Sequence, residues 1–269
     1  MEHINFEGLG LSLDINRVAI DFGFAKIYWY AIFIITGVII SLILCKKDDN
    51  KYNIKFDIIL KLALIVLPIS IICARIYFVL FKLDYYIQNP NQLLSINNGG
   101  LAIYGGIIGA AVTIIVFCKI KKIKILDMFD FIIPFLALGQ SIGRWGNFFN
   151  GEAHGIETTS LFRMGIIENG QYIQVHPTFL YESICTFIIF VVLYMYRNKR
   201  KFSGELTCLY FIMYGIARTI IESIRTDSLM LGPLRISQIL SIILVIVFAS
   251  IFIYKKVKKW KRDFTCISF

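Results

Sequence analysis

The stretch Gly139 to Gly155 reads GQSIGRWGNFFNGEAHG, and it closes an apolar run long enough to lie in a membrane. It holds an arginine, two asparagines, a glutamate, a histidine and five glycines. A charged side chain near hydrocarbon costs roughly 2.5–3.5 kcal/mol, so such residues usually face a protein interior or a water-filled cavity and mark a working site. The alternative is an ordinary helix end in which Arg144 reaches the lipid headgroups. We favour a site, because these polar residues are diverse and closely spaced.

Composition places the chain among integral membrane proteins. Of its 269 residues 57% are hydrophobic and only 17% are charged, with a mean hydropathy of +0.70, which excludes an ordinary soluble domain. Six cysteines lie at 45, 73, 118, 185, 208 and 266 without a Cys-x-x-Cys pair, so they predict small buried side chains rather than a disulfide framework or a metal site. No cleavable signal peptide is evident at the start.

Seven apolar windows are long enough to cross a hydrocarbon core of roughly 30 Å as helices. They lie at about 27–45, 57–80, 101–118, 126–142, 177–196, 205–224 and 235–254. The expected fold is therefore an all-α integral membrane protein that forms a single polytopic domain over 1–269.

The positive charge follows these windows. Of the 28 Lys and Arg residues, 18 lie in segments 46–55, 119–124, 197–201 and 255–262. Positive connections mark the cytoplasmic side, so we expect the N-terminus outside, the C-terminus in the cytoplasm and an odd number of spans. The net charge of +10 then reflects topology and indicates no nucleic-acid partner. Segments 81–100 and 143–176 fall on the outer side, where 143–176 is expected to form a small cap and where we expect the chemistry.

Five glycines stand in the eleven residues 99–109, at the start of the third window. Gly105 and Gly109 have a spacing that suits close helix packing. Alternatively, the glycines bring backbone amides near an anionic headgroup at a helix N-terminus, with Tyr104 at the same depth.

Two later helices carry polar residues inside apolar runs. His176-Pro177 opens the fifth window, and Glu182 lies about one turn inside it, where a carboxylate needs a cationic partner. In the sixth window, one polar stripe at i, i+4, i+8 and i+11 comprises Tyr214, Arg218, Glu222 and Arg225. An internal Arg–Glu pair that only holds the bundle together is the alternative to a binding site.

Arginines near the outer face suit a phosphate ligand, because the guanidinium fork binds phosphate bidentately. Hydrogen-bonding and proton-transfer groups stand beside them, namely Asn147, Asn150, Glu152, His154 and His176. The chain lacks a Gly-x-Ser-x-Gly elbow, a His-Glu-x-x-His motif and a phosphate loop, which argues against serine hydrolysis, zinc proteolysis and nucleotide-driven transport. The residues thus indicate a phospholipid site that opens outward.

The segment 143–152, GRWGNFFNGE, closely resembles the signature of the bacterial prolipoprotein diacylglyceryl transferases. The likeness covers almost the whole chain in the same order. It includes Tyr28 to Tyr30, the glycine-rich 99–106, His176 to Thr178 with Tyr181 and Glu182, and Tyr214-Gly215 with Arg218, Glu222 and Arg225.

This resemblance implies a seven-helix enzyme of the bacterial cytoplasmic membrane, without a metal or cofactor. It would move the diacylglyceryl group of phosphatidylglycerol onto the lipobox cysteine of a prolipoprotein, forming a thioether and releasing glycerol phosphate. Arg144 and Arg218 would hold the phosphate, and Asn147 and Glu152 would position headgroup and arginines. The further substrate-binding residues would be Tyr30, Gly105, Gly106, Asn150, His154, Gly155, His176, Tyr181, Glu182, Tyr214, Glu222 and Arg225.

At one position the chain departs from many members, which carry histidine where it has Tyr104. A tyrosine with a pKa of about 10 is a poor base at neutral pH. We therefore favour a mechanism in which the arginines lower the pKa of the substrate thiol from about 8.5, while Tyr104 hydrogen-bonds to phosphate or thiol. His154 and His176 remain alternative proton acceptors.

Three other functions compete with this one. A lipid flippase or transporter would use the same arginines without making bonds, but the polarity gathers toward one face and no internal repeat is evident. A structural or receptor-like protein would not need arginines and glutamates inside the membrane. An enzyme for another headgroup is disfavoured because the chain shows no carboxylate cluster for a metal.

Overall fold

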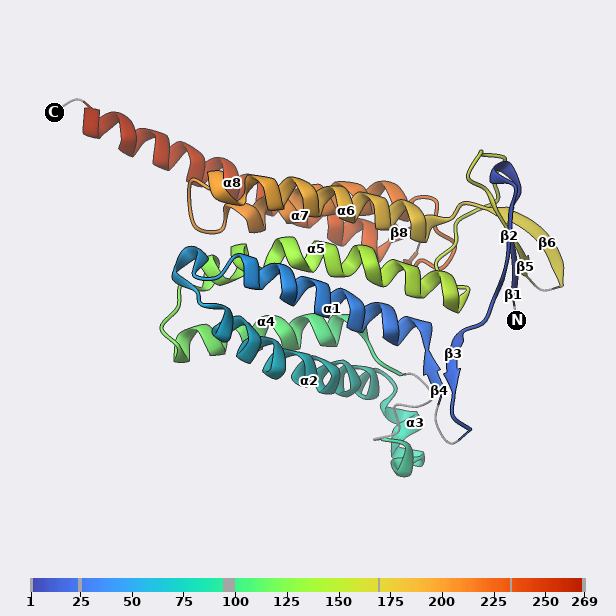
Figure 1. Cartoon of the computed structure of the whole chain (residues 1–269). Coiled ribbons are helices and arrows are strands. Elements are labelled where there is room, and N and C mark those ends of the chain that lie inside the picture. Colours follow the sequence, from blue (N-terminus) through green and yellow to red (C-terminus); the bar gives the residue numbers. More distant parts are fainter. Residues whose placement is uncertain (1, 24–25, 94–99, 169, 233, 268–269) are drawn as a thin grey trace. The chain divides into compact units, whose positions relative to one another are not determined.

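The computed structural model describes residues 2–23, 26–93, 100–168, 170–232 and 234–267, and it is mostly helical with a small sheet (Figure 1). The chain forms two compact units. One comprises residues 1–44 and 132–269, and the other residues 45–131.

The first unit holds most of the long helices. They are α6 (Thr178–Tyr196), α7 (Glu205–Glu222), α8 (Ile236–Ile267) and the larger parts of α1 (Trp29–Lys47) and α5 (Ile125–Asn150). The second unit holds α2 (Phe56–Phe81), α3 (Leu83–Gln88) and α4 (Ile103–Ile120). Short 3₁₀ turns lie at Glu7–Leu9, Lys51–Asn53, Pro90–Gln92 and Arg197–Lys199.

Six described helices are long and apolar enough to cross a membrane: α1, α2, α4, α5, α6 and α8. The prediction of a helical, multi-pass membrane protein is confirmed at this level. Helix α7 is less apolar because its eighteen residues include Glu205, Arg218 and Glu222. The count of seven spans and the orientation of the termini stay predictions.

Two predicted helix ends are too early. The window expected to end at 142 continues as α5 to Asn150, and the last one, expected to end at 254, continues as α8 to Ile267. Residues 143–150 contain no proline, and the basic residues of the tail are good helix formers in water. The first part of the expected cap, 143–150, is therefore the last part of a helix.

A four-stranded antiparallel sheet in the order β2-β1-β5-β6 takes two of its strands from the rest of segment 143–176 and two from the N-terminal residues. Its strands are β1 (Glu2–Phe6), β2 (Leu11–Ile15), β5 (Met164–Glu168) and β6 (Gln171–Val175). Two small hairpins are formed by β3 (Val18–Asp21) with β4 (Lys26–Tyr28) and by β7 (Met230–Leu231) with β8 (Leu234–Arg235). The sequence did not indicate that the N-terminal strands join this sheet.

One apolar core joins the sheet to the helices of its unit. It consists of Ile4, Phe6, Ile15, Phe148, Met164, Val175 and Phe179. Phe148 belongs to the last turns of α5, and Phe179 to the first turn of α6. The sheet therefore lies where α5 ends and α6 begins (Figure 1), and it fixes the two helix ends that carry Arg144 and Glu182.

Close contacts with neighbouring helices also hold the end of α5 in place. Ser141 Oγ donates to Ser183 O and Ser183 Oγ donates to Ser141 O, both at 2.9 Å, which ties α5 to α6. On the other side of α5, Gly146 lets α1 approach, because a Cβ atom there would lie 3.1 Å from the Cα atom of Tyr30.

In the second unit, α4 packs on α2 through its glycines. A Cβ atom on Gly105 would meet Tyr77 and the backbone of Cys73 and Ala74, and one on Gly109 would meet Cys73. These contacts support the close-packing interpretation of the two glycines.

Candidate active site

The buried carboxylate of Glu182 is the centre of the polar cluster. Its side chain, near the start of α6, is only 2% exposed. Arg144 of α5 donates from Nη2 to Glu182 Oε1, Arg218 of α7 donates from Nη1 to Oε2 at 2.9 Å, and Arg225 does so at 3.4 Å. Three arginines from three parts of the chain thus converge on one carboxylate.

A second buried carboxylate, Glu222, supports two of these arginines. Its Oε2 atom lies 2.7 Å from Arg218 Nη2 and 3.9 Å from Arg225 Nε, and its side chain is 1% exposed. Among the described residues, Oε2 finds no partner with hydrogen-bond geometry, so these contacts act through charge. Arg218 and Glu222 of the predicted polar stripe therefore pair on α7, whereas Arg225, its last member, lies beyond the end of the helix.

Asp227 forms a bidentate ion pair with Arg225. Arg225 donates from Nε to Asp227 Oδ1 at 2.9 Å and from Nη2 to Oδ2 at 2.6 Å. Partial burial works to raise the pKa of Asp227, but the hydrogen bonds and charge of Arg225 outweigh it and hold that pKa below its usual value. Asp227 thus stays ionised and fixes the guanidinium.

The buried part of the cluster carries excess positive charge. Three guanidinium groups, with side chains 20%, 15% and 9% exposed, face the two buried carboxylates of Glu182 and Glu222. Asp227 is half exposed. With Asp227 counted, three guanidinium groups face three carboxylates, and an anionic group beside Arg144 and Arg218 would bind through guanidinium N–H donors that the carboxylates do not engage.

Tyrosines line the same region of α7. Tyr214 donates its hydroxyl to Glu182 Oε1 at 3.4 Å. Tyr210 stacks on Tyr214 with ring centroids 5.5 Å apart, and its hydroxyl donates to Gln140 Oε1 at 2.7 Å. The predicted residue Tyr214 therefore contacts the cluster directly.

The loop that follows α5 forms main-chain hydrogen bonds that fix the backbone beside Arg225. Gly155 N–H donates to His176 O and Ile156 N–H donates to Ile224 O, both at 2.8 Å, and Gly155 forms a bridge with Arg225. A Cβ atom on Gly155 would lie 2.8 Å from Ile224 O and 2.9 Å from His176 Cβ. Only glycine fits this close approach.

The two predicted histidines lie in this loop region. His154 Nδ1 is 3.4 Å from the hydroxyl of Thr226, and its Nε2 is 4.0 Å from Glu168. His176 Nδ1 is 3.1 Å from the hydroxyl of Tyr181. Both rings therefore have partners within the protein.

Other predicted residues lie at the edge of the cluster or apart from it. Asn147 accepts a hydrogen bond from Arg144 Nη1 at 3.4 Å. Glu152 is exposed and accepts from Asn150 Nδ2 at 3.3 Å, so its described contact is with the asparagine rather than with an arginine. Tyr30, on α1, lies against Gly146 of α5.

Three predicted residues belong to the other unit. Tyr104, Gly105 and Gly106 stand in the first turn of α4, with Tyr104 half buried. There Arg75 donates to three backbone oxygens, those of Leu93 (2.9 Å), Gly100 (2.9 Å) and Gln92 (2.7 Å). Arg75 thus organises the chain that leads into α4.

Comparison with known proteins shows the family of the chain. A family model described as prolipoprotein diacylglyceryl transferase matches residues 17–254. The chain belongs to this family. It is therefore a transferase, and the family predicted from the motifs is confirmed.

Curated members of the prolipoprotein diacylglyceryl transferase family resemble the chain over nearly all of its length. The phosphatidylglycerol–prolipoprotein diacylglyceryl transferase of Bacillus cytotoxicus is 45% identical over 263 residues, which cover 95% of this chain and 97% of the relative. Those of Finegoldia magna and Clostridioides difficile are each 45% identical over 245 residues. These two alignments cover 91% and 90% of this chain and 96% and 97% of the relatives.

Several residues that build this polar cluster escaped the sequence analysis. Gln140, Ser141, Ser183 and Tyr210 lie in apolar helices, where a single polar residue gives little signal of its neighbour on another helix. Asp227 lies beyond the end of α7, where helical spacing no longer applies. In the part of the chain that the structure describes, no group of three or more His, Cys, Asp or Glu side chains is placed to hold a metal ion.

Proposed function

We propose that the chain transfers the diacylglyceryl group of phosphatidylglycerol to the lipobox cysteine of a prolipoprotein. The sulfur of the cysteine attacks the glycerol carbon that bears the phosphate ester. A carbon–sulfur bond forms, the carbon–oxygen bond breaks, and its electron pair leaves with the oxygen of glycerol phosphate. The proton of the thiol is lost to the leaving phosphate or to water. The observation that carries the proposal is the convergence of Arg144, Arg218 and Arg225 on Glu182 in a member of this family.

Arg144 and Arg218 bind the phosphate in this proposal. Both are the more exposed members of the cluster, and a guanidinium presents five N–H donors, of which the carboxylates engage only some. Negative charge grows on the leaving phosphate in the transition state, and donors that are already in place stabilise that charge without reorganising. Glu182 and Glu222 act as positioning residues that keep the arginines aimed.

Other predicted residues take supporting roles. Asn147 orients Arg144, and Glu152 with Asn150 lies at the edge, where the glycerol headgroup enters. Tyr30, Tyr214, His154, Gly155, His176 and Tyr181 shape the surrounding cavity. In this proposal Tyr104, Gly105 and Gly106 bind the substrate, Tyr104 by a hydrogen bond to phosphate or thiol, while the arginines lower the thiol pKa.

We further propose that the chain is one polytopic domain with seven spans in the bacterial cytoplasmic membrane. The N-terminus and the cap face outward, and the C-terminus lies in the cytoplasm. The charged groups of α7 support its spanning role, because Arg218 and Glu222 pair within the protein and Glu205 accepts from Tyr196 and from Phe202 N–H.

A transfer assay tests the proposed function. The full chain in detergent receives acyl-labelled phosphatidylglycerol and a lipobox peptide, and label on the peptide is counted. We expect transfer by the wild type, none to a peptide whose cysteine is serine, and a loss of at least about 100-fold in Arg144→Ala. Arg163→Ala, a cap arginine that pairs with Glu7, is the matched control and should retain transfer. Folded wild type that binds the lipid but labels no peptide would favour binding or transport instead.

A further inference from the structure

Helices α5 and α7 carry one more pair of polar side chains beyond the arginine cluster. Gln140 precedes Arg144 on α5, and Tyr210 precedes Tyr214 on α7, in both cases by one helical turn. Residues at this spacing lie on the same face of a helix. The hydroxyl of Tyr210 donates to Gln140 Oε1 at 2.7 Å. This pair therefore lies one turn further from the cap than Arg144 and Tyr214.

The pair is connected to the cluster through the tyrosines of α7. Tyr210 stacks on Tyr214 with ring planes 3° apart and centroids 5.5 Å apart, and Tyr214 donates to Glu182 Oε1 at 3.4 Å. One turn further from the cap, the corresponding positions of the two helices are Leu136 and Leu206. The polar wall of the site thus extends one turn beyond the arginines, and apolar side chains follow it.

Gln140 retains a donor that the protein does not use. Its Oε1 atom accepts from Tyr210, whereas no described residue accepts from its Nε2 atom. The side chain is partly buried, and this nitrogen remains accessible. The nearby hydroxyls of Ser141 and Ser183 are engaged with each other's main-chain oxygens. An amide donor beside apolar side chains needs an acceptor, and the hydrocarbon core of a membrane supplies no water.

A phospholipid carries an acceptor at the corresponding depth. In phosphatidylglycerol the carbonyl of the sn-2 ester is about five bonds from the phosphorus, which is roughly 6 Å when extended. One helical turn advances by about 5.4 Å. A phosphate bound by Arg144 and Arg218 therefore brings this carbonyl to the level of Gln140. A carbonyl oxygen only accepts hydrogen bonds, so it suits the unused amide donor.

We infer that Gln140 Nε2 donates to the sn-2 ester carbonyl of the diacylglyceryl group and makes the chain selective for ester-linked over ether-linked lipids. Tyr210 is a positioning residue, because its bond to Oε1 turns the Nε2 atom of Gln140 toward the lipid. The carbon that is attacked lies between the phosphate and the sn-2 carbon, so contacts on both sides of it fix its orientation. This inference rests on the proposed function, from which it takes the lipid and the place of its phosphate.

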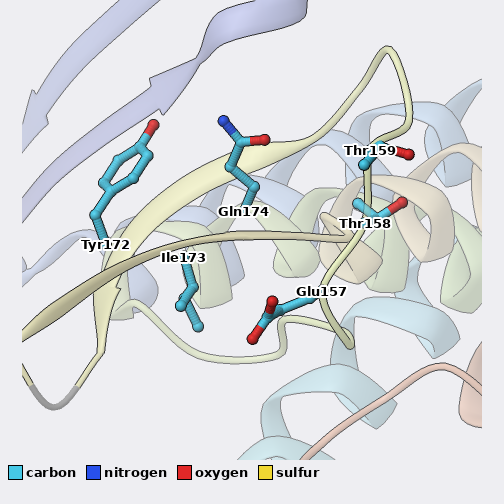
Figure 2. A pocket seen from close by; sticks show the side chains of 6 residues that line it. All are labelled: Glu157, Thr158, Thr159, Tyr172, Ile173 and Gln174. Carbon is cyan, nitrogen blue, oxygen red and sulfur yellow. The ribbon is translucent and has the colours of Figure 1, made fainter.

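The cap offers a matched glutamine as a control. Gln174 of β6 lies beside a hollow of about 630 Å³ (Figure 2), away from α5 and α7 in the chain. The hollow is lined by Tyr172, Ile173 and Gln174 of β6 and by Glu157, Thr158 and Thr159 of the preceding loop. Gln174 is also partly buried, but its Nε2 atom donates to Glu7 Oε2 at 2.5 Å. Its amide donor is therefore already used within the protein.

Ether-linked lipids test the contact. The full chain in detergent receives a lipobox peptide and phosphatidylglycerol in which the sn-2 ester is replaced by an ether of equal chain length, and modified peptide is counted. We expect kcat/KM for the lipid to fall about tenfold, as for the loss of one hydrogen bond, with KM for the peptide unchanged. An ether at sn-1 alone should change it by less than about twofold. Equal kcat/KM for the sn-2 ester and the sn-2 ether would overturn the inference.

Gln140→Leu gives the complementary test, because leucine removes the amide and keeps a similar size. We expect this variant to lose about tenfold more kcat/KM with the sn-2 ester than with the sn-2 ether, so that the preference disappears. Gln174→Leu should keep the preference. Equal losses with both lipids would mean that Gln140 acts only through the packing of Tyr210, and the inference would be wrong. Folded wild type that modifies no peptide even with the ester lipid would instead contradict the proposed function itself.

Discussion

Glu182 shows how one residue can organise a site inside a membrane. A buried carboxylate is costly unless charged groups surround it, and the three arginines, largely shielded from solvent, would repel one another without it. The sequence could predict that this carboxylate needs a cationic partner, because it stands inside an apolar helix. It could not predict that the partners come from α5, from α7 and from the segment beyond α7, since helical spacing relates residues within a helix only.

Replacing Glu182 with Gln should therefore weaken both stability and transfer. The amide keeps the shape but leaves Arg144, Arg218 and Arg225 with one fewer negative charge. We expect the free energy of unfolding in detergent to fall by about 3 kcal/mol and transfer to fall by more than about 100-fold. Asp14→Asn is the control, because that carboxylate is exposed and contacts only His3 among the contacts that the structure describes. Equal unfolding curves for the Gln variant and wild type would contradict the anchoring role.

Tyr104 gives a second test at this scale. If the arginines lower the thiol pKa and Tyr104 only hydrogen-bonds, Tyr104→Phe should reduce kcat by about tenfold, since one hydrogen bond to a charged group is worth about 1.5 kcal/mol. The pH at which transfer reaches half its maximum should stay the same. Full turnover would remove Tyr104 from the mechanism, and a displaced pH profile would assign it a role in proton transfer.

At the scale of elements, the loop after α5 decides how Arg225 is held. The glycines and polar residues of this loop predict it from the sequence. They do not predict where α5 ends, because residues 143–150 are compatible with both helix and loop. The N-terminal strands were missed for a related reason. They are short, and β1 joins β5 across more than a hundred and fifty residues, which no local pattern reports.

Gly155→Ala should disturb this loop without changing any charged group. The new Cβ atom would meet Ile224 O and His176, so the backbone beside Arg225 must move. Overpacking of this kind costs about 1–3 kcal/mol, and transfer should fall with it. Gly139→Ala is the matched control, because a Cβ atom there meets nothing within 4 Å. Calorimetry and the transfer assay on both variants would check this, and equal behaviour of the two would count against the loop's role.

The fork between Arg225 and Asp227 predicts an acid-sensitive component of stability. The pKa of Asp227 is lowered in the folded protein, so its contribution is complete above the unfolded value near ~3.9 and is lost as the pH falls through the folded value. Asp227→Asn should lower the melting temperature by about 1–3 °C at pH 7, and the difference should shrink as the pH falls below about 3.9 toward the folded pKa. Thermal scans across this range would show it. A difference that persists unchanged at pH 3 would mean that the ionised fork does not cause it.

At the scale of the whole molecule, composition predicted the class of protein and the basic segments predicted its topology. Six helices meet the length and apolarity of a span, while α7 falls short because it carries the charges of the site. Its charged side chains have partners inside the protein, which removes the main energetic objection to a spanning role. The catalytic proposal and the count of seven spans are thus linked through the same residues.

Site-directed labelling tests this topology. In a chain whose native cysteines are replaced, Lys199→Cys lies between α6 and α7, and Leu229→Cys lies between α7 and α8. If α7 spans the membrane with the proposed orientation, a membrane-impermeant maleimide added outside intact cells should label Leu229→Cys only. Lys199→Cys should react after permeabilisation. Labelling of both positions from the same side would contradict the seven-span arrangement.

The most direct test of the central claim is the release of glycerol phosphate from headgroup-labelled phosphatidylglycerol, measured together with the mass of the peptide. The account predicts one glycerol phosphate for each peptide that gains a diacylglyceryl group on its cysteine. Both products should disappear together in Arg144→Ala and Arg218→Ala and persist in Arg163→Ala. Release without peptide modification, or unchanged release in folded Arg144→Ala, would contradict a transferase built on the arginines around Glu182.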